Sequence, residues 1–368
     1  MHLKTLKLFQ FKNYTQTEFN FNPELNCLVG LNGAGKTNVL DAIYYLAFTK
    51  SYFNPVDHQH ILKGEQFFTV EGTLSKEEID ESIRIVVQRG IKKSLQVNNN
   101  EVPRFADYIG EMPLVMIAPG DINLIYEGSE ERRKFVDMII SQTDKNYLHE
   151  LMSYNRVLDQ RNKLLKDFWE QRYVDRDLLE TYNKQLSKSG TFVYGGRIKF
   201  LESFTPVFSK YYQMISDSFE QVNLSFESDL DKQNYGELLQ ANETSDFELQ
   251  RTSRGIHRDD LVFSLNDMPL KKFGSQGQQK SFIFALKLAQ FDYLMETKKE
   301  KPLLLIDDIF EKLDKVRLAK LLTLIAQGHF GQIFISDTQA DRLHQVIEKL
   351  QTPVSYFEIS KGELVSTT

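Results

Sequence analysis

The stretch Gly30-Leu31-Asn32-Gly33-Ala34-Gly35-Lys36-Thr37 decides the fold of this chain. It matches the phosphate-loop pattern G-x-x-x-x-G-K-[ST] and follows the strand-like run 26–29. Its glycines let successive backbone N–H groups point at phosphate oxygens, and the helical run 38–48 adds the positive end of a helix dipole. Lys36 is expected to reach the β- and γ-phosphates, and the Thr37 hydroxyl to ligate Mg²⁺. A chance glycine-rich turn is the alternative, but strand, loop and helix in this order favour a binding site for a nucleoside triphosphate.

Composition sets the outer limits of the prediction. The 368 residues suit a large core with an elaboration, and 41% hydrophobic residues are enough to fill that core. No run of 18 apolar residues exists, and residues 1–4 alternate like a strand, unlike a signal peptide. The single cysteine, Cys27, lies within an apolar strand-like run, which excludes a disulfide framework. We therefore expect a cytoplasmic protein that does not enter a membrane.

The pattern along the chain predicts two β-rich parts that flank a helical one. Period-two alternation and short apolar runs predict strands at 3–11, 17–21, 25–29, 67–74, 82–88, 94–97, 114–118, 261–265, 302–306 and 332–335, with a closing hairpin over 356–365. Residues 130 to about 219 are helical in pattern, with interruptions expected at Gly190 and Gly195-Gly196. The predicted domains are 1–129 (ATPase, first part), 130–222 (inserted helical lobe) and 223–368 (ATPase, second part).

A second motif, Leu303-Leu304-Leu305-Ile306-Asp307-Asp308, is an apolar strand that ends in two carboxylates. A Mg²⁺-dependent triphosphatase needs such a pair opposite its phosphate loop. Asp307 is expected to bind the metal, directly or through water, and Asp308 to orient or deprotonate the attacking water. Many strands end in acidic residues, so the phosphate loop upstream is what makes this motif specific.

A third motif, Phe273-Gly274-Ser275-Gln276-Gly277-Gln278-Gln279, precedes an apolar helix expected over 281–295. Ser275, Gln276, Gly277 and Gln278 would present a hydroxyl, backbone amides and a helix N-terminus, which together make a second anion-binding end. Because the chain already has its own phosphate loop, this end needs a phosphate from another molecule. The alternatives are a Gly/Ser/Gln-rich linker, or a Ser275 that merely caps a helix beginning near Gln278.

Charge is unevenly distributed along a chain of net charge −6. Residues 132–210 hold fifteen Lys/Arg and ten Asp/Glu, a local excess of five positive charges. Residues 213–268 hold four Lys/Arg and twelve Asp/Glu, a local excess of eight negative charges. A nucleic-acid footprint therefore belongs to the middle of the chain, unless both segments are ordinary solvated helix faces.

These motifs resemble the ABC-type ATPase heads of the SMC class, and within that class the RecF family of bacterial recombination and gap-repair proteins. The segments that carry the closer resemblance are Phe11-Lys12-Asn13-Tyr14, Glu127 to Phe135, Tyr154 to Leu165, His257-Arg258-Asp259-Asp260-Leu261 and Ser275 to Gln279. The fold that this resemblance implies is α/β: a mixed central sheet with flanking helices and an antiparallel β part, with an inserted helical lobe.

The resemblance also implies a slow Mg²⁺-dependent ATPase that acts as an ATP-dependent homodimer. ATP held by Lys36 of one subunit would be capped by Ser275 of the other, and hydrolysis would loosen the dimer. Family members help to load the strand-exchange protein at replication gaps, with RecR and RecO as partners. DNA, single-stranded or as a gapped duplex, would meet basic side chains of the middle segment. The candidates are Arg132, Arg133, Lys134, Arg156, Arg161 and Lys163, although the first three could instead cap a helix or pair with Asp137.

Several positions depart from the family pattern. Ile256 stands where a proline is usual, Glu311 to Asp314 replace a serine-led loop, and Ser336-Asp337-Thr338 occupy the region where transporter heads place a histidine. Asp308 is shorter than the glutamate that ABC transporters often use, so slow hydrolysis suited to a switch is expected.

Three other classes of protein share such a head. A transporter subunit would need a membrane-coupling partner. A nuclease of the overcoming-lysogenization-defect type would need a metal-binding domain after Asp308, where only about sixty residues follow. An SMC-like clamp is a further alternative.

Overall fold

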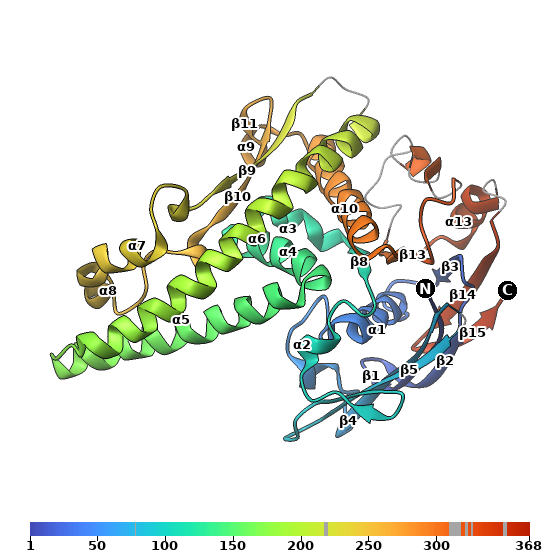
Figure 1. Cartoon of the computed structure of the whole chain (residues 1–368). Coiled ribbons are helices and arrows are strands. Elements are labelled where there is room, and N and C mark those ends of the chain that lie inside the picture. Colours follow the sequence, from blue (N-terminus) through green and yellow to red (C-terminus); the bar gives the residue numbers. More distant parts are fainter. Residues whose placement is uncertain (78, 217–219, 309–317, 321–322, 325–326, 349–351) are drawn as a thin grey trace. The chain divides into compact units, whose positions relative to one another are not determined.

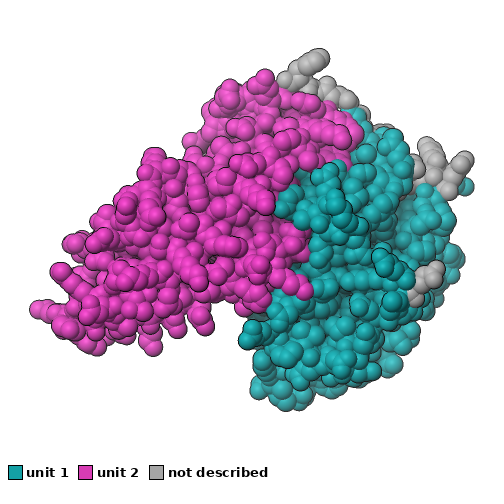
Figure 2. Space-filling model, in the orientation of Figure 1, with its two compact units in different colours: residues 1–121, 280–368 teal, residues 122–279 magenta. Residues whose placement is uncertain are grey.

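The computed structural model describes residues 1–368 except 78, 217–219, 309–317, 321–322, 325–326 and 349–351 (Figure 1). Its contacts divide the chain into two compact units, shown in Figure 2. Residues 1–121 and 280–368 form one, here called the nucleotide unit, and residues 122–279 form the other, here called the helical unit.

The nucleotide unit is built around a six-stranded sheet of order β15-β14-β3-β13-β12-β8 (Figure 1). All neighbours are parallel except β15, which pairs antiparallel with β14. Every residue of the three central strands β3, β13 and β12 is buried, which explains their nearly unbroken apolar sequences. The bounds of the strands are β3 Leu25–Val29, β8 Leu114–Ile117, β12 Leu303–Ile306, β13 Ile333–Asp337, β14 Val354–Ser360 and β15 Glu363–Thr367.

A second, antiparallel sheet of order β2-β1-β4-β5-β6-β7 completes this unit. Phe21, which follows β2, packs edge-on against Phe334 and Phe357 of the central sheet, with ring centroids 4.8 and 5.3 Å apart. The apolar face of the antiparallel sheet therefore shares one core with the parallel sheet. Its strands are β1 His2–Phe11, β2 Tyr14–Asn20, β4 Phe67–Lys76, β5 Ile79–Gln88, β6 Ser94–Val97 and β7 Asn100–Glu101.

Helices flank these sheets. Eleven of the thirteen residues of α1 (Lys36–Phe48) are buried, since the helix follows the phosphate loop into the core. The helix α10 (Gln276–Lys298) starts in the helical unit and ends in the nucleotide unit. Further helical segments of this unit that lie wholly within the described residues are η1 Asp57–His60, α2 Phe105–Tyr108 and α13 Ala340–Ile347, with η2 Pro119–Ile122 at the boundary of the unit.

The helical unit consists of a long helix pair and a small sheet of order β11-β10-β9. The pair is formed by α5 (Lys145–Gln171) and α6 (Arg176–Ser216), whose apolar faces contact each other. The other elements are α3 Asn123–Tyr126, α4 Ser129–Thr143, β9 Val222–Glu227, η3 Asp229–Asp231, α7 Tyr235–Ala241, α8 Glu243–Leu249, η4 Ile256–Arg258, β10 Asp260–Leu265, β11 Met268–Pro269 and α9 Leu270–Phe273. Within the described residues, no helix is long and apolar enough to cross a membrane.

The predicted interruptions of the second long helix are wrong, because α6 runs unbroken through Gly190, Gly195 and Gly196. Two of these glycines make room for aromatic rings. A Cβ on Gly190 would lie 2.4 Å from the Tyr235 ring, and one on Gly196 would lie 2.7 Å from the Tyr147 ring. Gly190 and Gly196 thus allow close packing, which the sequence alone cannot distinguish from a helix break.

The predicted fold class is confirmed, and residues 223–279 group differently from the predicted domain division. They belong with the helices because β9 packs against α6 and β10 against α4. The sequence had assigned this stretch to the second ATPase part on the strength of its strand pattern. The boundaries 1–129, 130–222 and 223–368 stay a proposal.

Candidate nucleotide site

The phosphate loop joins the end of β3 to the start of α1. Three of its glycines have positive φ angles: 155° at Gly30, 78° at Gly33 and 124° at Gly35. A Cβ on Gly30 would lie 2.2 Å from the Ile359 carbonyl oxygen, so glycine is required there for space as well as for backbone conformation. The loop therefore has the curled backbone that the sequence predicted.

Hydrogen-bond donors gather in this loop. The buried Lys36 ammonium donates to the carbonyl oxygens of Gly30 at 2.8 Å and Leu31 at 3.0 Å. Within the described chain, the backbone N–H groups of Gly35, Lys36 and Thr37 donate to no other protein group. Open N–H groups at a helix start, next to an ammonium, make a site for phosphate oxygens.

The Thr37 hydroxyl and the Asp307 carboxylate meet although 270 residues separate them. Thr37 Oγ1 donates to the two carboxylate oxygens of Asp307 at 3.0 and 3.2 Å. The parallel strands explain the meeting, because β3, β13 and β12 all end at the edge of the sheet where the loop lies.

Ser336 lies near the end of β13, the strand between β3 and β12. It forms hydrogen bonds with both Asp307 and Asp308. Its hydroxyl donates to Asp307 Oδ1 at 2.6 Å and accepts the Asp308 N–H at 3.0 Å. Sequence reasoning noted Ser336 only as part of the segment that replaces a transporter histidine. A polar residue ending a buried strand beside the phosphate loop was the available signal.

Burial raises the pKa of the Asp307 carboxyl above its ordinary value, opposed by hydrogen bonds from Ser336 and Thr37 and by the nearby Lys36 charge. A divalent cation would favour the ionised carboxylate there. Among the described residues no cluster of three metal-ligating side chains exists. One carboxylate and one hydroxyl fit Mg²⁺, which usually takes its other ligands from waters and substrate phosphates.

Asp308 lies next to this site with a φ of 46°, an uncommon value for a residue other than glycine. Its N–H is held by Ser336, which fixes the backbone at the carboxylate. The segment Glu311 to Asp314, a departure from the family pattern, lies outside the described residues.

Two residues contact the phosphate loop from outside: Asn13 in the β1–β2 turn and Tyr14, the first residue of β2. Asn13 Nδ2 donates to the Ala34 carbonyl oxygen at 3.1 Å, and Asn13 Oδ1 accepts from Asn38 at 2.7 Å. The Tyr14 hydroxyl donates to the Gly35 carbonyl oxygen at 3.1 Å. A Cβ on Gly35 would come within 2.8 Å of both side chains, so this glycine also permits these contacts.

The closing hairpin also supports the loop. Gly362, between β14 and β15, donates its N–H to the Ala34 carbonyl oxygen at 2.8 Å. The sequence singled out Asn13 and Tyr14 as a family feature but gave them no role, and it gave none to Gly362. Both turns lie far from residue 34 in the sequence, and only the sheet topology brings them to it.

The signature segment, residues 275–278, lies at the start of α10 in the helical unit. The Ser275 N–H donates to Gln278 Oε1 at 2.6 Å, and the Gln278 N–H donates to Ser275 Oγ at 3.3 Å. This reciprocal pair is a capping box, so Ser275 does cap the helix, which begins at Gln276. The side chain of Ser275 is exposed, and capping leaves its hydroxyl proton available for another acceptor.

The basic residues of α4 are engaged within the helical unit. Arg132 makes a two-bond pair with the Asp260 carboxylate at 2.7 and 2.9 Å. Arg133 donates to Ser129 Oγ at 2.7 Å and to the Asp259 carbonyl oxygen at 2.6 Å. Lys134 is exposed but pairs with Glu130 and Glu131 on its own helix.

The alternative pairing with Asp137 is wrong for all three, because Arg197 on α6 takes that carboxylate at 2.9 Å. Arg197 also reaches Asp259 at 2.8 Å, and so ties α6 to the segment that precedes β10.

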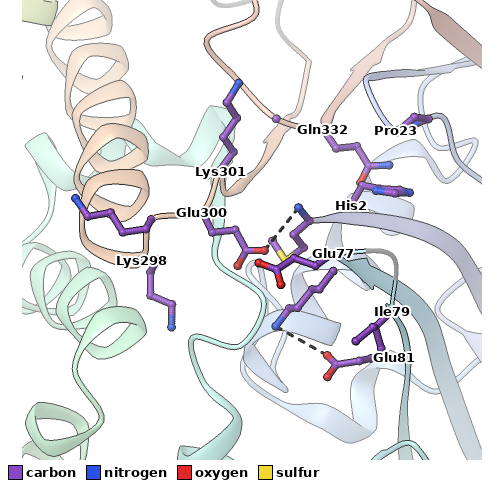
Figure 3. Close-up of a pocket in the computed structure, with 13 residues that line it drawn as sticks. His2, Pro23, Glu77, Ile79, Glu81, Lys298, Glu300, Lys301 and Gln332 are labelled. Carbon is purple, nitrogen blue, oxygen red and sulfur yellow. Dashed lines mark ion pairs between the residues drawn. The ribbon is translucent and has the colours of Figure 1, made fainter.

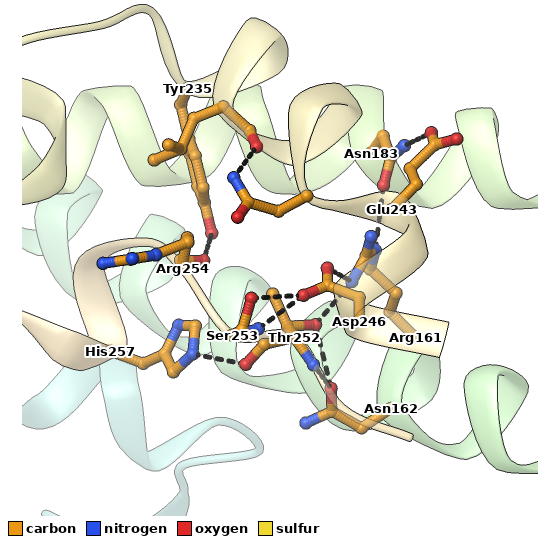
Figure 4. A network of polar contacts seen from close by, with 12 residues as sticks. Arg161, Asn162, Asn183, Tyr235, Glu243, Asp246, Thr252, Ser253, Arg254 and His257 are labelled. Atoms are coloured by element: carbon orange, nitrogen blue, oxygen red, sulfur yellow. Dashed lines mark hydrogen bonds and ion pairs between the residues drawn. The ribbon is translucent and has the colours of Figure 1, made fainter. Parts of the chain in front are cut away.

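Arg161 is wrong as a surface candidate, because it is completely buried in the network of Figure 4. Its guanidinium donates to Asp246 at 2.7 Å, to Thr252 Oγ1 at 2.8 Å and to Asn183 Oδ1 at 2.8 Å. Asn162, the next residue, accepts the Thr252 N–H at 2.7 Å (Figure 4). These bonds join α5, α6, α8 and the loop after α8, so Arg161 has a structural role.

His257 belongs to the same network. Its Nε2 faces the Thr252 carbonyl oxygen at 3.1 Å and must donate, so its Nδ1 accepts from the Tyr154 hydroxyl at 2.7 Å. Burial lowers the pKa of His257 to about 4, consistent with this neutral ring. Arg156 and Lys163 remain as exposed candidates, and neither forms an ion pair with a described residue.

A separate pocket of about 780 Å³ is shown in Figure 3. It lies where the central parallel strands begin, whereas the phosphate loop lies where they end. Residues just before β3, β12 and β13 line it, among them Pro23, Lys301 and Gln332. Ion pairs within it offset much of its charge: the chain's amino group with Glu300 at 3.6 Å, and Lys76 with Glu81 at 3.9 Å. It contains no glycine-rich helix start, and it is not the expected nucleotide site.

The phosphate loop, the strand ending in Asp307 and Asp308, and the signature segment define an ABC-type ATPase head of the SMC class. A family model described as the RecF/RecN/SMC N terminal domain matches residues 2–358. The chain belongs to the RecF family of DNA replication and repair proteins, as its motifs predicted.

Relatives match over almost their full lengths. A protein of Flavobacterium johnsoniae, named DNA replication and repair protein RecF, is 48% identical over 359 residues, which cover 98% of this chain and all of the relative. The protein of that name from Bacteroides thetaiotaomicron is 42% identical, covering 98% of each chain.

Solved structures of a RecF protein and of an Smc head are similar to this chain. One, described as the recombination mediator protein RecF-ATP in the RecFOR pathway, has a TM-score of 0.89 at 28% identity and covers 100% of this chain and 97% of its own. An Smc head bound to the C-terminal winged-helix domain of ScpA has a TM-score of 0.60 at 15% identity, which shows the shared fold alone.

Proposed function

We propose that this protein is an ATP-gated dimer that binds DNA and helps to load the strand-exchange protein at replication gaps. The observation that carries the proposal is the assembled Thr37–Asp307–Ser336 cluster beside open phosphate-binding donors. The protein groups that would bind phosphate and Mg²⁺ thus all come from one chain, and a second helix start, at Gln276, has open donors for another anion.

In a dimer, the ATP bound to the partner subunit would supply the phosphate for this second helix start. In the proposed dimer, the Ser275 hydroxyl and the backbone amides of Gln276 and Gly277 contact the γ-phosphate of ATP held by Lys36 of the partner subunit, and Gln278 caps the helix through Ser275. Support comes from the exposure of Ser275 and from its free hydroxyl proton. A symmetric pair contains two such contacts, so the loss of the γ-phosphates would loosen the interface.

Hydrolysis requires a metal ion and an oriented water. Asp307 and Thr37 would hold Mg²⁺, which would supply positive charge to the phosphates, and Lys36 would contact the β- and γ-phosphates. Asp308 would orient or deprotonate the attacking water. Its side chain is shorter than that of the glutamate that ABC transporters often use, which is in keeping with slow turnover.

The DNA-binding surface is proposed to include Arg156 and Lys163, which are seven residues apart on the exposed side of α5. Lys134 could exchange its helix partners for a phosphate, while Arg132 and Arg133 would first have to leave theirs. Since the RecF–ATP structure is described as part of the RecFOR pathway, we further propose RecR and RecO as partners and the cytoplasm as the place of action.

Replacing Asp308 by Asn tests this function. ATP binding should persist, because Asp307 and Thr37 are intact, but hydrolysis should fall at least about a hundredfold and the ATP-bound dimer should accumulate. Hydrolysis and sedimentation are measured together, with nicking of supercoiled DNA as a check on the nuclease alternative. Hydrolysis at the parent rate would remove Asp308 from the reaction, and DNA nicking would contradict the proposed class.

A further inference from the structure

Three side chains of the helical unit connect the end of α6 with the start of α10. The Tyr212 hydroxyl donates to Glu220 Oε2 at 2.6 Å. Gln278 Nε2 donates to the other carboxylate oxygen of Glu220 at 2.7 Å. Tyr212 lies near the C-terminal end of α6, and Gln278 is in the first turn of α10.

Glu220 fixes the orientation of the Gln278 amide. An ionised carboxylate can accept hydrogen bonds but cannot donate them, so the amide nitrogen of Gln278 must face Glu220. The amide oxygen is then turned toward the Ser275 N–H, which it accepts at 2.6 Å. Without Glu220 the amide could turn over and present its donors to another donor.

This orientation determines which groups of the signature segment are left for a phosphate. The Ser275 N–H and the Gln278 N–H are used within the capping box. The Ser275 hydroxyl proton and the N–H groups of Gln276 and Gly277 are not, and they lie at the positive end of α10. The Glu220–Gln278 bond therefore holds the capping box closed while the donors needed for an anion stay open.

Tyr212 anchors Glu220 firmly, since its side chain is fully buried on α6. The same helix carries Arg197, which is held between Asp137 and Asp259. The signature segment is thus connected through Glu220 to α6 as well as to its own turn.

We infer that Glu220 is a positioning residue for the signature segment and that Tyr212 is its anchor. This inference rests on the proposed function, because it assumes that Ser275 meets the γ-phosphate of a partner subunit. Glu220 itself contacts no nucleotide in this account. It fixes the orientation of the Gln278 amide, and the amide oxygen in turn holds the backbone N–H of Ser275.

Tyr212→Phe and Glu220→Ala test the inference, with Tyr194→Phe as the matched control. Tyr194 also lies on α6 and also donates to a carboxylate, that of Asp231 at 2.7 Å, but this pair has no bond to the signature segment. The measurements are ATP affinity of the dilute monomer, the dissociation constant of the ATP-dependent dimer, and kcat.

Both test variants should bind ATP like the parent, while their dimers dissociate at about tenfold higher concentration, since each symmetric dimer contains two signature contacts. Glu220→Gln keeps an acceptor oxygen and should recover part of the loss. Tyr194→Phe should leave all three measurements unchanged.

Dimers of Tyr212→Phe and Glu220→Ala as tight as those of the parent would overturn the inference. So would an equal loss in Tyr194→Phe, because the effect would then not depend on the signature segment. If Glu220→Ala folds poorly, the comparison of Tyr212→Phe with Tyr194→Phe is enough to test the inference, because each of these variants loses only one hydroxyl group. A parent protein that stays monomeric with ATP would contradict the proposed function itself, which distinguishes the two failures.

Discussion

The charged residues that the sequence singled out have different partners in the nucleotide unit and in the helical unit. In the nucleotide unit, Lys36 and Asp307 converge on one site whose open donors suit a ligand. In the helical unit, Arg132, Arg161 and Arg197 bind carboxylates of their own unit. A motif of fixed spacing therefore identified charges that converge on one candidate site, whereas an excess of positive charge identified residues that mostly hold helices together.

The largest effect should come from breaking the buried pair in the helical unit. Arg161→Met leaves the Asp246 carboxylate buried without its cation and should lower the free energy of unfolding by about 3–5 kcal/mol. Arg156→Met, on the exposed side of the same helix, should change it by less than about 0.5 kcal/mol. Urea unfolding measures both, and similar losses in the two variants would contradict the contrast between buried and exposed arginines.

The corresponding change in the nucleotide unit should affect binding and spare folding. Lys36→Met removes the ammonium of the phosphate loop and should weaken ATP binding at least about a hundredfold, abolishing ATP-dependent dimerisation. Lys63→Met, on the surface of the same unit, is the control and should bind ATP normally. Calorimetric titration with ATP decides, and parent-like affinity of a folded Lys36→Met would refute the site.

The neutral His257 should make the helical unit sensitive to acid. Its pKa is about 4 in the folded chain, against an ordinary value of 6.5, so the unfolded chain takes up the proton first as the pH falls. The free energy of unfolding therefore decreases as the pH falls from about 6.5 toward 4, by about 2 kcal/mol between pH 7 and pH 5.

Unfolding of the parent and of His257→Gln across this range measures the effect. Asp259, whose pKa burial raises to about 6, titrates in both proteins and cancels in the difference. Equal pH slopes for the two proteins would show that His257 does not carry the effect.

The predictable part of this structure is the part that local sequence determines. The phosphate loop can be recognised from neighbouring residues alone, and the apolar run 302–306 was enough to predict a strand, which the structure places at Leu303–Ile306. Asn13, Ser336 and Gly362 were not given roles, since each reaches the loop or Asp307 only through strands paired across the sheet.

Errors arose where one residue type has two physical uses. A glycine can break a helix or let a ring approach it, and Gly190 does the latter. An arginine can bind DNA or neutralise a buried carboxylate, and Arg161 does the latter. Composition contains no information about burial, so neither choice could be made before the packing was known.

Sedimentation of Ser275→Arg with ATP tests the central claim, a γ-phosphate shared between two subunits, most directly. Ser275 is outside the phosphate loop of its own chain, so the monomer should bind ATP almost normally. The added cation and bulk should prevent the dimer that the parent forms with ATP. An ATP-dependent dimer of Ser275→Arg as tight as that of the parent would show that Ser275 only caps α10, and would contradict the shared site.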